Sequence, residues 1–402
     1  MEYSQEHPKM RWVEVLPVSQ DGRQMFYLKD HEGLTESSLV VSRDVLFLIA
    51  LMDGKRSLRD LQEEYTRASG TLVHLEQIQS VVEAMDAGFL LDNERFQNCL
   101  QKAKQEYESA LYRQPCCSGR SYPEEKEELL AYFNQLFAGT ESPQAKGDML
   151  GILAPHIDYA RGYKVYREVY KYLPLTDKEL VVIIGTCHGL APNLWNISLK
   201  DFCTPLGILP CTGEMARLVR ANPVLSRHLD EWCHRTEHSI ELQLPIIQHQ
   251  LMGRNVETLC ILTGSMHEYM SSEENPDTGI LRDLCDNLKQ VLEAYGKPYL
   301  VIAGADLAHI GAQFGDRYAL DHSTLFDSKT KDEEILERVR KVDGGGFLAA
   351  IRAEEDRRRI CGLAPMYFQL SLLEGSSCDI VSYDQWTDGK SSVSFAGAVF
   401  YR

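Results

Sequence analysis

The apolar positions of residues 149–401 follow alternating strand and helix periods. Short runs of apolar, often β-branched residues alternate with stretches that have the apolar spacing of an amphipathic helix. This alternation predicts an α/β fold with a mostly parallel sheet sandwiched by helices, and the long last strand is expected at an antiparallel edge. The expected strands are 149–153, 180–184, 257–262, 299–303, 379–383 and 392–401, and the expected helices are 124–137, 163–172, 240–250, 280–295, 332–339, 346–353 and 365–373.

The first hundred residues carry a different pattern, in which short helical stretches end in an apolar run. Ser42 and Ser57 precede stretches with helical spacing, and Asp60 completes a capping box with Ser57. This order predicts a small winged-helix α+β module. Its expected elements are a loose hairpin over 10–28, helices over 43–52, from residue 58 and over 75–87, and a short strand or wing at 89–91.

Length and charge bound the organisation of the chain. A length of 402 residues favours two domains. We expect a winged-helix recognition module over 1–97, a charged helical linker over 98–114 and an α/β domain over 115–402. The module suits either recognition or a role as a packed appendage. The formal net charge of −17 and the pI near 5.2 argue against nucleic acid or an anionic membrane as the main partner, because both bind basic surfaces.

The cysteines and the apolar runs bear on the cellular compartment. The eleven cysteines include no C-x-x-C pair, and the adjacent Cys116 and Cys117 are interpreted as a feature of the linker. The chain starts with polar and acidic residues rather than with a signal peptide. Its longest apolar run, 45–52, is far shorter than the roughly 20 residues of a membrane span. These features favour a reducing cytoplasm.

Histidines follow three of the expected strands, and a cysteine precedes an expected helix. His156, His188 and His309 each come soon after an apolar run. Ligands in open α/β sheets bind beyond the carboxyl ends of the strands, so these imidazoles are expected to converge. Cys361 lies near a helix N-terminus, which lowers the pKa of a thiol and suits a metal ligand or a nucleophile. Together the four residues predict a metal site, although each one alone also suits a structural role in the core.

Two pairs of ionisable residues are three positions apart. His238 and Glu241 would share a face of the helix expected at 240–250 and would hold a ligand or a proton-transfer group in place. Asp306 and His309 suit an acid–base pair beside the metal. Capping and core hydrogen bonding are the alternative roles for both pairs.

These motifs occur in the order found in one known family, and the chain resembles the Memo family in this respect. The closest description is that of the bacterial AmmeMemoRadiSam system protein B. The N-terminal stretch, with Leu51-Met-Asp-Gly54 and Ala87-Gly-Phe-Leu90, resembles the PqqD-like peptide-recognition fold found beside radical SAM enzymes. The motifs that carry the Memo resemblance are Pro-His156 with Tyr159, Gly-Thr-Cys-His188, Glu-His238-Ser-Ile-Glu241, Asp306-x-x-His309, Cys361-Gly and Ser-Ser-Val-Ser-Phe-Ala-Gly397.

The resemblance implies a fold like that of the class III extradiol ring-cleaving dioxygenases. It implies that His156, His188 and Cys361 bind the metal, with Asp306 and His309 beside it. Cys361 takes the place of a Glu in the dioxygenases, and a thiolate is a softer ligand than a carboxylate. The implied cofactor is iron, with copper or zinc as alternatives, and the standard ring-cleavage route is not implied. The family name also implies a radical SAM protein and an AMMECR-type protein as partners.

The favoured hypothesis is a metal-dependent redox or oxygenase-like enzyme. His309 would move protons, Asp306 would orient His309, and His238 with Glu241 would support the substrate or the metal ligands. The N-terminal module would present a peptide or dock a partner. One alternative is a scaffold whose site binds metal without turnover. The other is a Cys- or zinc-dependent hydrolase, with Cys361 as the nucleophile and a His within about 3 Å as the base.

Overall fold

The computed structural model describes residues 6–20, 22–30, 32–35, 39–141, 143–144, 146–270 and 278–402. The polar start of the chain, on which the argument against a signal peptide rests, includes residues 1–5, which lie outside this set. The chain divides into two compact units, Met1–Ser109 (unit 1) and Ala110–Arg402 (unit 2). The division falls within the stretch 98–114 that the sequence assigned to a linker, and helix α5 (Glu94–Ser109) is part of unit 1.

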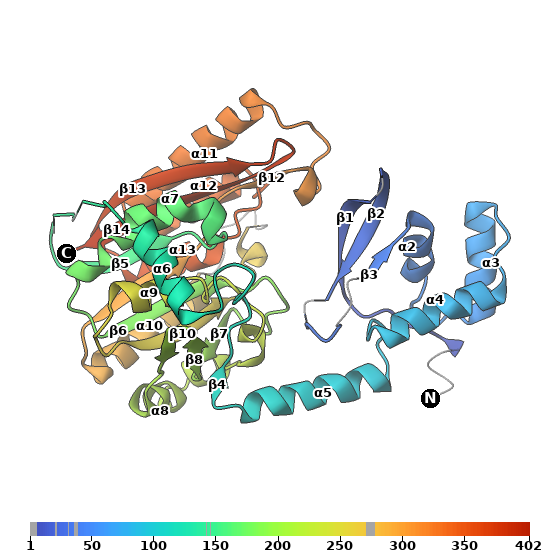
Figure 1. The fold of residues 1–402 in the computed structure, drawn as a ribbon, viewed down its shortest axis with the longest axis horizontal. Coiled ribbons are helices and arrows are strands. Elements are labelled where there is room, and N and C mark those ends of the chain that lie inside the picture. Colours follow the sequence, from blue (N-terminus) through green and yellow to red (C-terminus); the bar gives the residue numbers. More distant parts are fainter. Residues whose placement is uncertain are drawn as a thin grey trace. The chain divides into compact units, whose positions relative to one another are not determined.

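Unit 1 combines an antiparallel sheet with helices that follow it in the chain (Figure 1). Strand β2 (Arg23–Lys29) pairs with β1 (Glu14–Gln20) on one side and with β3 (Leu39–Val41) on the other. Inward side chains, among them the fully buried Leu61 and Ile78, form one apolar core. The helices that follow the sheet are α2 (Arg43–Ala50), α3 (Leu58–Ser69), α4 (Leu75–Ala87) and α5.

The predicted helix starts of unit 1 are present. The Ser42 hydroxyl accepts a hydrogen bond from the Val45 N–H, and it is the N-cap of α2. Ser57 is the N-cap of α3 and forms the capping box with Asp60. Both caps satisfy backbone N–H groups that the first helical turn leaves without an intrahelical partner.

The predicted wing at 89–91 does not form a strand. Leu91 makes only an isolated bridge to Met10. Phe89 has a positive φ of 56°, which turns the chain, and the Leu90 and Leu91 side chains then bury themselves in the core. The hairpin expected over 10–28 is present as β1 and β2, so the sheet of unit 1 lies before its helices, and the wing expected after them is absent from the described part of the unit.

Unit 2 is built around an eight-stranded mixed sheet. Its centre is parallel, in the order β5 (Met149–Ala154), β11 (Tyr299–Gly304), β6 (Leu180–Thr186) and β10 (Glu257–Thr263). Antiparallel strands flank this centre, with β7 (Trp195–Ser198) on β10 and β14 (Ser391–Tyr401) on β5. β14 also pairs with β12 (His309–Gly311) and with β13 (Ser377–Thr387), again antiparallel.

The expectation of a mostly parallel sheet is therefore too strong, because β7, β12, β13 and β14 form only antiparallel pairs. β14 was expected at an edge, yet it is paired on both sides. β13 pairs with β14 along one side. On the other side of β14, β12 pairs with its first residues and β5 with its last residues. The period of apolar residues identifies a strand but does not reveal its direction.

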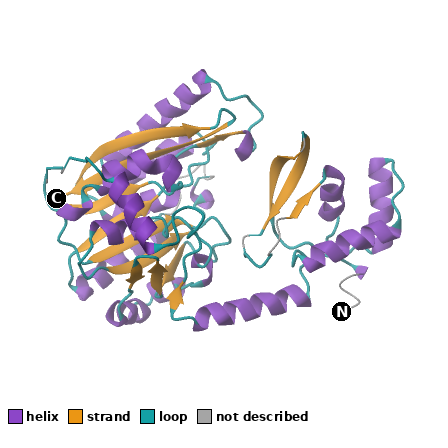
Figure 2. Cartoon of the chain, viewed as in Figure 1, coloured by secondary structure: helices purple, strands orange, loops and turns teal. Residues whose placement is uncertain are grey.

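Helices cover both faces of the sheet (Figure 2). The central strands are apolar on both faces, so in β6 Val181 and Ile183 contact one layer of helices while Val182 and Ile184 contact the other. The first layer contains α6 (Lys126–Leu136), α7 (Tyr159–Tyr170) and α9 (Leu244–Gln250), and the second contains α8 (Gly213–Ala221), α10 (Gly279–Tyr295), α11 (His322–Arg340), α12 (Gly344–Ala353) and α13 (Leu363–Leu372).

The stretch between β6 and α8, for which the sequence predicted no strand, contains β7, β8 (Asp201–Thr204) and β9 (Gly207–Leu209). A small second sheet has the order β4 (Tyr112–Arg113), β8 and β9.

None of the helices in the described part of the chain is long and apolar enough to cross a membrane. Short 3-10 turns lie at Leu173–Leu175, Leu225–His228, Trp232–His234, His267–Tyr269 and Ala312–Phe314.

The register of the parallel strands positions the candidate site. Ala154 of β5 is level with Gly304 of β11, and Gly304 is level with Gly185 of β6. The residues that follow these three strands therefore emerge next to one another at a single edge of the sheet.

We expect Ser57→Ala to weaken helix α3. The substitution removes the oxygen that accepts from the Asp60 N–H at 3.2 Å, and the loss of an N-cap costs about 1 kcal/mol. Amides of α3 should exchange with solvent about five times faster in hydrogen–deuterium exchange mass spectrometry. Ser80→Ala, at an exposed position of α4, is the control. Unchanged exchange of α3 in Ser57→Ala would contradict the role of the cap.

Candidate functional site

Three side chains from separate segments meet beyond the carboxyl ends of the parallel strands. His156 lies two residues after β5, His188 two residues after β6, and Cys361 two residues before α13. Their ligand-capable atoms lie within 4.8 Å of one another, and the Cys361 Sγ is 3.2 Å from the His156 Nε2. His156 is buried, whereas His188 and Cys361 are partly exposed. The residues that the sequence proposed as metal ligands therefore form one cluster.

Backbone contacts fix the orientation of His156. Its Nδ1 lies 2.8 Å from the Gly304 carbonyl oxygen. Because a carbonyl only accepts, Nδ1 carries the proton and Nε2 keeps a lone pair. Burial, followed by the nearby His188 and His238, lowers the pKa of His156 well below its usual range, so the ring is neutral. A Cβ at Gly304 would lie 2.5 Å from the Ser239 carbonyl oxygen, so this close approach requires glycine.

Glu237 orients two further imidazoles. Its Oε1 accepts from the Nδ1 of His188 and from the Nδ1 of His238, both at 3.0 Å, and the two rings stack with centroids 4.6 Å apart. Burial opposes ionisation of this carboxyl, but His188 and His238 hold the pKa of Glu237 well below its usual range. The sequence analysis did not single out Glu237. Its only signal was its place directly before His238 in a histidine-bearing motif.

Cys361 is held by backbone contacts on both sides. The Thr186 hydroxyl donates to the Cys361 carbonyl at 2.8 Å. The N–H of Gly362 donates to the Asp306 carbonyl at 3.0 Å, and a Cβ on Gly362 would come within 2.4 Å of that oxygen. These contacts keep the thiol beside His156.

The expected lowering of the Cys361 pKa does not occur in the protein itself. Burial, followed by the Asp306 carboxyl, raises the pKa of the Cys361 thiol well above its usual range. Cys361 also lies before the N-cap of α13, Gly362, rather than inside the first turn of the helix. A bound cation would oppose the effect of burial, because a metal deprotonates a coordinating thiol.

Asp306 faces His156 rather than His309. Its Oδ1 accepts from the His156 N–H at 2.9 Å, and its Oδ2 lies 3.8 Å from the His156 Nε2. Burial raises the pKa of Asp306 to about 7. Backbone groups of Leu307 and Arg359 orient His309 instead, and the Leu307 carbonyl oxygen lies 3.1 Å from its Nδ1. Burial lowers the pKa of His309 to about 4, so its ring is a neutral base at physiological pH.

Glu241 lies in a different cluster from His238. The segment between them forms turns, and α9 begins only at Leu244, so the three-residue spacing does not place the two side chains on one helical face. The Glu241 carboxylate pairs with the Arg113 guanidinium, and both side chains are at most 1% exposed. Burial opposes its ionisation, but Arg113 and other donors lower the pKa of Glu241. Glu241 thus anchors the start of unit 2 to its core.

Cys116 and Cys117 belong to this second cluster. Their N–H groups donate to Glu241 at 2.8 and 2.7 Å, and the Tyr122 hydroxyl donates to the same carboxylate at 2.6 Å. The two Sγ atoms lie 3.7 Å apart and close enough to Glu241 to suit a metal geometrically. Both oxygens of Glu241 already accept several hydrogen bonds, however, so the carboxylate has little capacity left for an ion. We assign this cluster a structural role.

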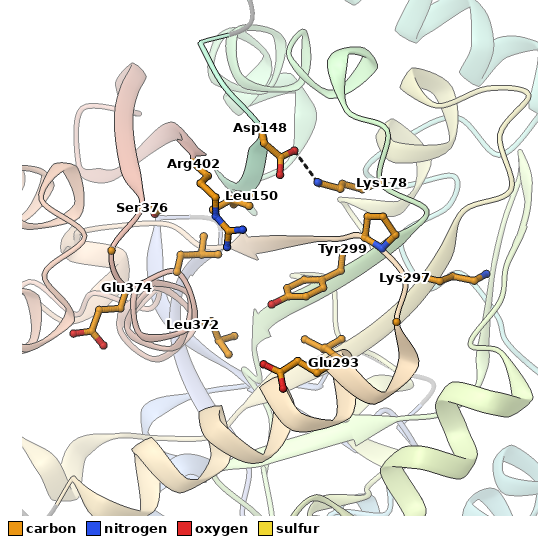
Figure 3. Close-up of a pocket in the computed structure, with 15 residues that line it drawn as sticks. Asp148, Leu150, Lys178, Glu293, Lys297, Tyr299, Leu372, Glu374, Ser376 and Arg402 are labelled. Carbon is orange, nitrogen blue, oxygen red and sulfur yellow. Dashed lines mark hydrogen bonds and ion pairs between the residues drawn. The ribbon is translucent and has the colours of Figure 1, made fainter.

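A pocket of about 460 Å³ lies at the opposite end of the sheet (Figure 3). Asp148, Lys178 and Tyr299, at the starts of β5, β6 and β11, are among the residues that line it. Lys178 donates to Asp148 at 2.7 Å, so these two charges balance each other. The length of the parallel strands separates this pocket from the histidine and cysteine cluster. The residues that can bind a metal or move protons therefore lie at the carboxyl edge of the sheet, and this edge is the candidate site.

We expect Glu241→Gln to destabilise unit 2 strongly. The change leaves the buried Arg113 charge without its carboxylate, which costs about 3–5 kcal/mol. Urea unfolding followed by circular dichroism measures the loss. Glu106→Gln is the control, because its pair with Lys102 is exposed at 3.7 Å and contributes about 0.3–0.5 kcal/mol. Equal, small effects of the two changes would contradict the structural role of Glu241.

Comparisons with known proteins agree with this arrangement. The family model described as "Memo-like protein" matches residues 113–399. A MEMO1 family protein of Aquifex aeolicus is 28% identical over 401 residues, covering 98% of this chain and 100% of its own length. Another, of Desulfurococcus amylolyticus, is 28% identical over 304 residues, covering 72% of this chain and 96% of its own. A third, of Thermus thermophilus, is 26% identical over 310 residues, covering 76% and 87%. The chain belongs to the Memo-like protein family.

Proposed function

We propose that this protein binds one metal ion through His156, His188 and Cys361 and acts as a metal-dependent redox or oxygenase-like enzyme. The observation that carries the proposal is the convergence of the three ligand-capable atoms within 4.8 Å. They come from three segments that are far apart in the sequence, at the edge of a parallel sheet where α/β proteins bind ligands.

The donor set fits a transition metal. The Nδ1 atoms of His156 and His188 are engaged by the Gly304 carbonyl and by Glu237, so their Nε2 lone pairs are free to coordinate. Such outer hydrogen bonds are characteristic of metal-binding imidazoles. Two imidazoles and a thiolate suit iron, copper and zinc. We favour iron because the resemblance to class III extradiol dioxygenases implies a non-haem iron site.

The residues beside the ligands suit proton handling. A bound iron ion would supply Lewis acidity and one-electron chemistry. His309 is neutral because burial lowers its pKa to about 4, so its ring can take a proton from a substrate. His238 is tied to Glu237, which against the effect of burial raises the His238 pKa and favours its protonated form. The site therefore offers one proton acceptor and one proton donor.

A Cys-dependent hydrolase is the second candidate, because the Cys361 Sγ lies 3.2 Å from the His156 Nε2. That distance suits a nucleophile and its base. The electrostatics favour the metal site instead. Burial raises the pKa of Cys361 and lowers the pKa of His156, which disfavours a thiolate–imidazolium pair. A scaffold that binds metal without turnover uses the same ligands and differs only in the absence of a reaction.

The proposal extends to partners. A radical SAM protein and an AMMECR-type protein would act with this chain in the cytoplasm, as the resemblance to the AmmeMemoRadiSam proteins suggests. Unit 1 has its own core and sheet, which supports a separate role in presenting a peptide or docking a partner. This role rests on the PqqD-like resemblance of its sequence.

We expect Cys361→Ser to remove most of the bound metal. Anaerobically purified wild-type protein should contain stoichiometric iron. Elemental mass spectrometry measures the iron content, and a visible absorption band reports coordination of the iron by a thiolate. Replacing one ligand should lower the affinity by more than the roughly 10–100-fold loss typical of outer-shell changes. Cys99→Ser, a partly exposed thiol of unit 1, is the matched control.

Alkylation distinguishes the hydrolase. A metal-free wild-type protein whose Cys361 reacts rapidly with iodoacetamide at neutral pH would reject the metalloenzyme and favour the hydrolase. Partner binding that survives in Cys361→Ser, together with stoichiometric metal and no turnover in the wild type, would favour the scaffold.

The pKa of Asp306 predicts a pH dependence of stability in the metal-free protein. Its folded-state pKa of about 7 lies above the ordinary value of 3.8, so between these values the folded state holds a proton that the unfolded state releases. This stabilisation is complete below the lower value and is lost as the pH rises through the upper one. Relative to Asp306→Asn, the wild-type free energy of unfolding should fall by about 1.4 kcal/mol per pH unit in this window. The prediction is wrong if the free energies of unfolding of the wild type and of Asp306→Asn, measured in urea, change equally with pH between these two pKa values.

A further inference from the structure

His309 of the candidate site belongs to a row of residues that crosses three neighbouring strands and leads away from the site. His309 of β12 lies opposite Val393 of β14, and Val393 lies opposite Trp386 of β13. Residues directly opposite in antiparallel strands share a face of the sheet. His309 and Trp386 therefore point to the same side, with backbones about 10 Å apart.

Arg161 covers the far end of this row. It lies in the first turn of α7, which packs on β13 and β14. Its guanidinium carbon is 4.8 Å from the centroid of the Trp386 ring. Its Nε pairs with the Asp158 carboxylate, which also accepts from the Arg161 N–H. The Arg161 side chain is 38% exposed. Among the described residues, its two terminal amino groups donate to no protein atom.

An apolar wall connects His309 to Arg161. Phe314 contacts the His309 ring edge to face, with centroids 5.0 Å apart. Phe314 and Trp386 both pack on one buried apolar cluster and are themselves partly exposed. The cluster consists of Ile157, Val165, Val393 and Phe395.

We propose that Arg161 binds the anionic group of the substrate, and that the substrate is a carboxylate or a phosphate ester with an apolar body. The terminal amino groups of an arginine form a planar fork that matches both anions. The Trp386 ring packs against the Arg161 guanidinium and fixes its orientation. Phe314 and Trp386 would contact the apolar body of the substrate. The reacting end would then lie at His309, a step that rests on the proposed function, whereas anion binding by Arg161 does not.

The alternative is that Arg161 only stabilises α7 through its pair with Asp158. That role uses the Nε atom and the backbone N–H and leaves the terminal amino groups unused. It predicts that changing Arg161 alters the stability of α7 without altering which ligands the protein prefers. Asp158 is the anion closest to the guanidinium, so it weakens the binding of another anion without excluding it.

The test uses metal-free full-length protein, so a failure of metal binding does not affect it. Isothermal titration calorimetry compares 3-phenylpropionate and phenyl phosphate with the neutral 3-phenylpropionamide. We expect the wild type to bind at least one of the two anions about tenfold more tightly than the amide, because hydrogen bonds to a charged group are the stronger ones. The tighter of the two anions identifies the group, carboxylate or phosphate.

Two variants assign the preference to Arg161. Arg161→Gln should bind the anions no better than the amide, while Arg161→Lys should keep part of the preference. Arg167→Gln is the matched control, because Arg167 lies on the same helix and pairs with Glu168 at 3.3 Å. Circular dichroism reports whether the variants fold. Equal binding of acid and amide by the wild type, no binding of either anion at millimolar concentration, an anion preference that survives in a folded Arg161→Gln, or its loss in Arg167→Gln would each overturn the proposal.

Discussion

The candidate site depends on one buried carboxylate, that of Glu237. It accepts hydrogen bonds from the Nδ1 atoms of His188 and His238 and from the backbone N–H groups of His188, His238 and Ser239. A carboxylate buried without partners costs several kcal/mol, and these five donors offset that cost. Because they come from the end of β6 and from the turns before α9, Glu237 joins two segments. It also fixes the imidazole orientation that the strand ends alone leave free.

Short-range patterns predicted the parts of the site that follow directly from strand positions. His156 and His188 were found because each follows a buried strand, and the register of the parallel strands then brings them together. Glu241 was misplaced because the spacing rule assumes a helix, whereas the chain forms turns there and α9 begins later. Glu237 carried no spacing signal, since a residue next to His238 would point elsewhere in any regular helix.

Features that depend on distant parts of the chain could not be predicted in the same way. The apolar period identified the strands of unit 2, but their antiparallel pairing depends on how β12, β13 and β14 fold against one another. In unit 1 the capping box at Ser57 is local and was predicted, while the apolar run 89–91 joins the core instead of forming a wing. The pKa of Cys361 also depends on burial, which outweighs the proximity of a helix N-terminus.

The ionisation states at the centre are consistent with a site for a cation. Burial favours the protonated forms of Asp306 and Cys361 and the neutral form of His156, while the Glu237 carboxylate is ionised and balanced by the protonated form of His238 that it favours. A cation would draw the proton from the thiol first, because it would coordinate the sulfur directly. His309 would stay neutral, since a nearby cation lowers the pKa of an imidazole further. The Arg161 guanidinium acts on this balance from a distance, because its charge lowers the pKa of both Asp306 and His309, and its terminal amino groups still face an anion from solution.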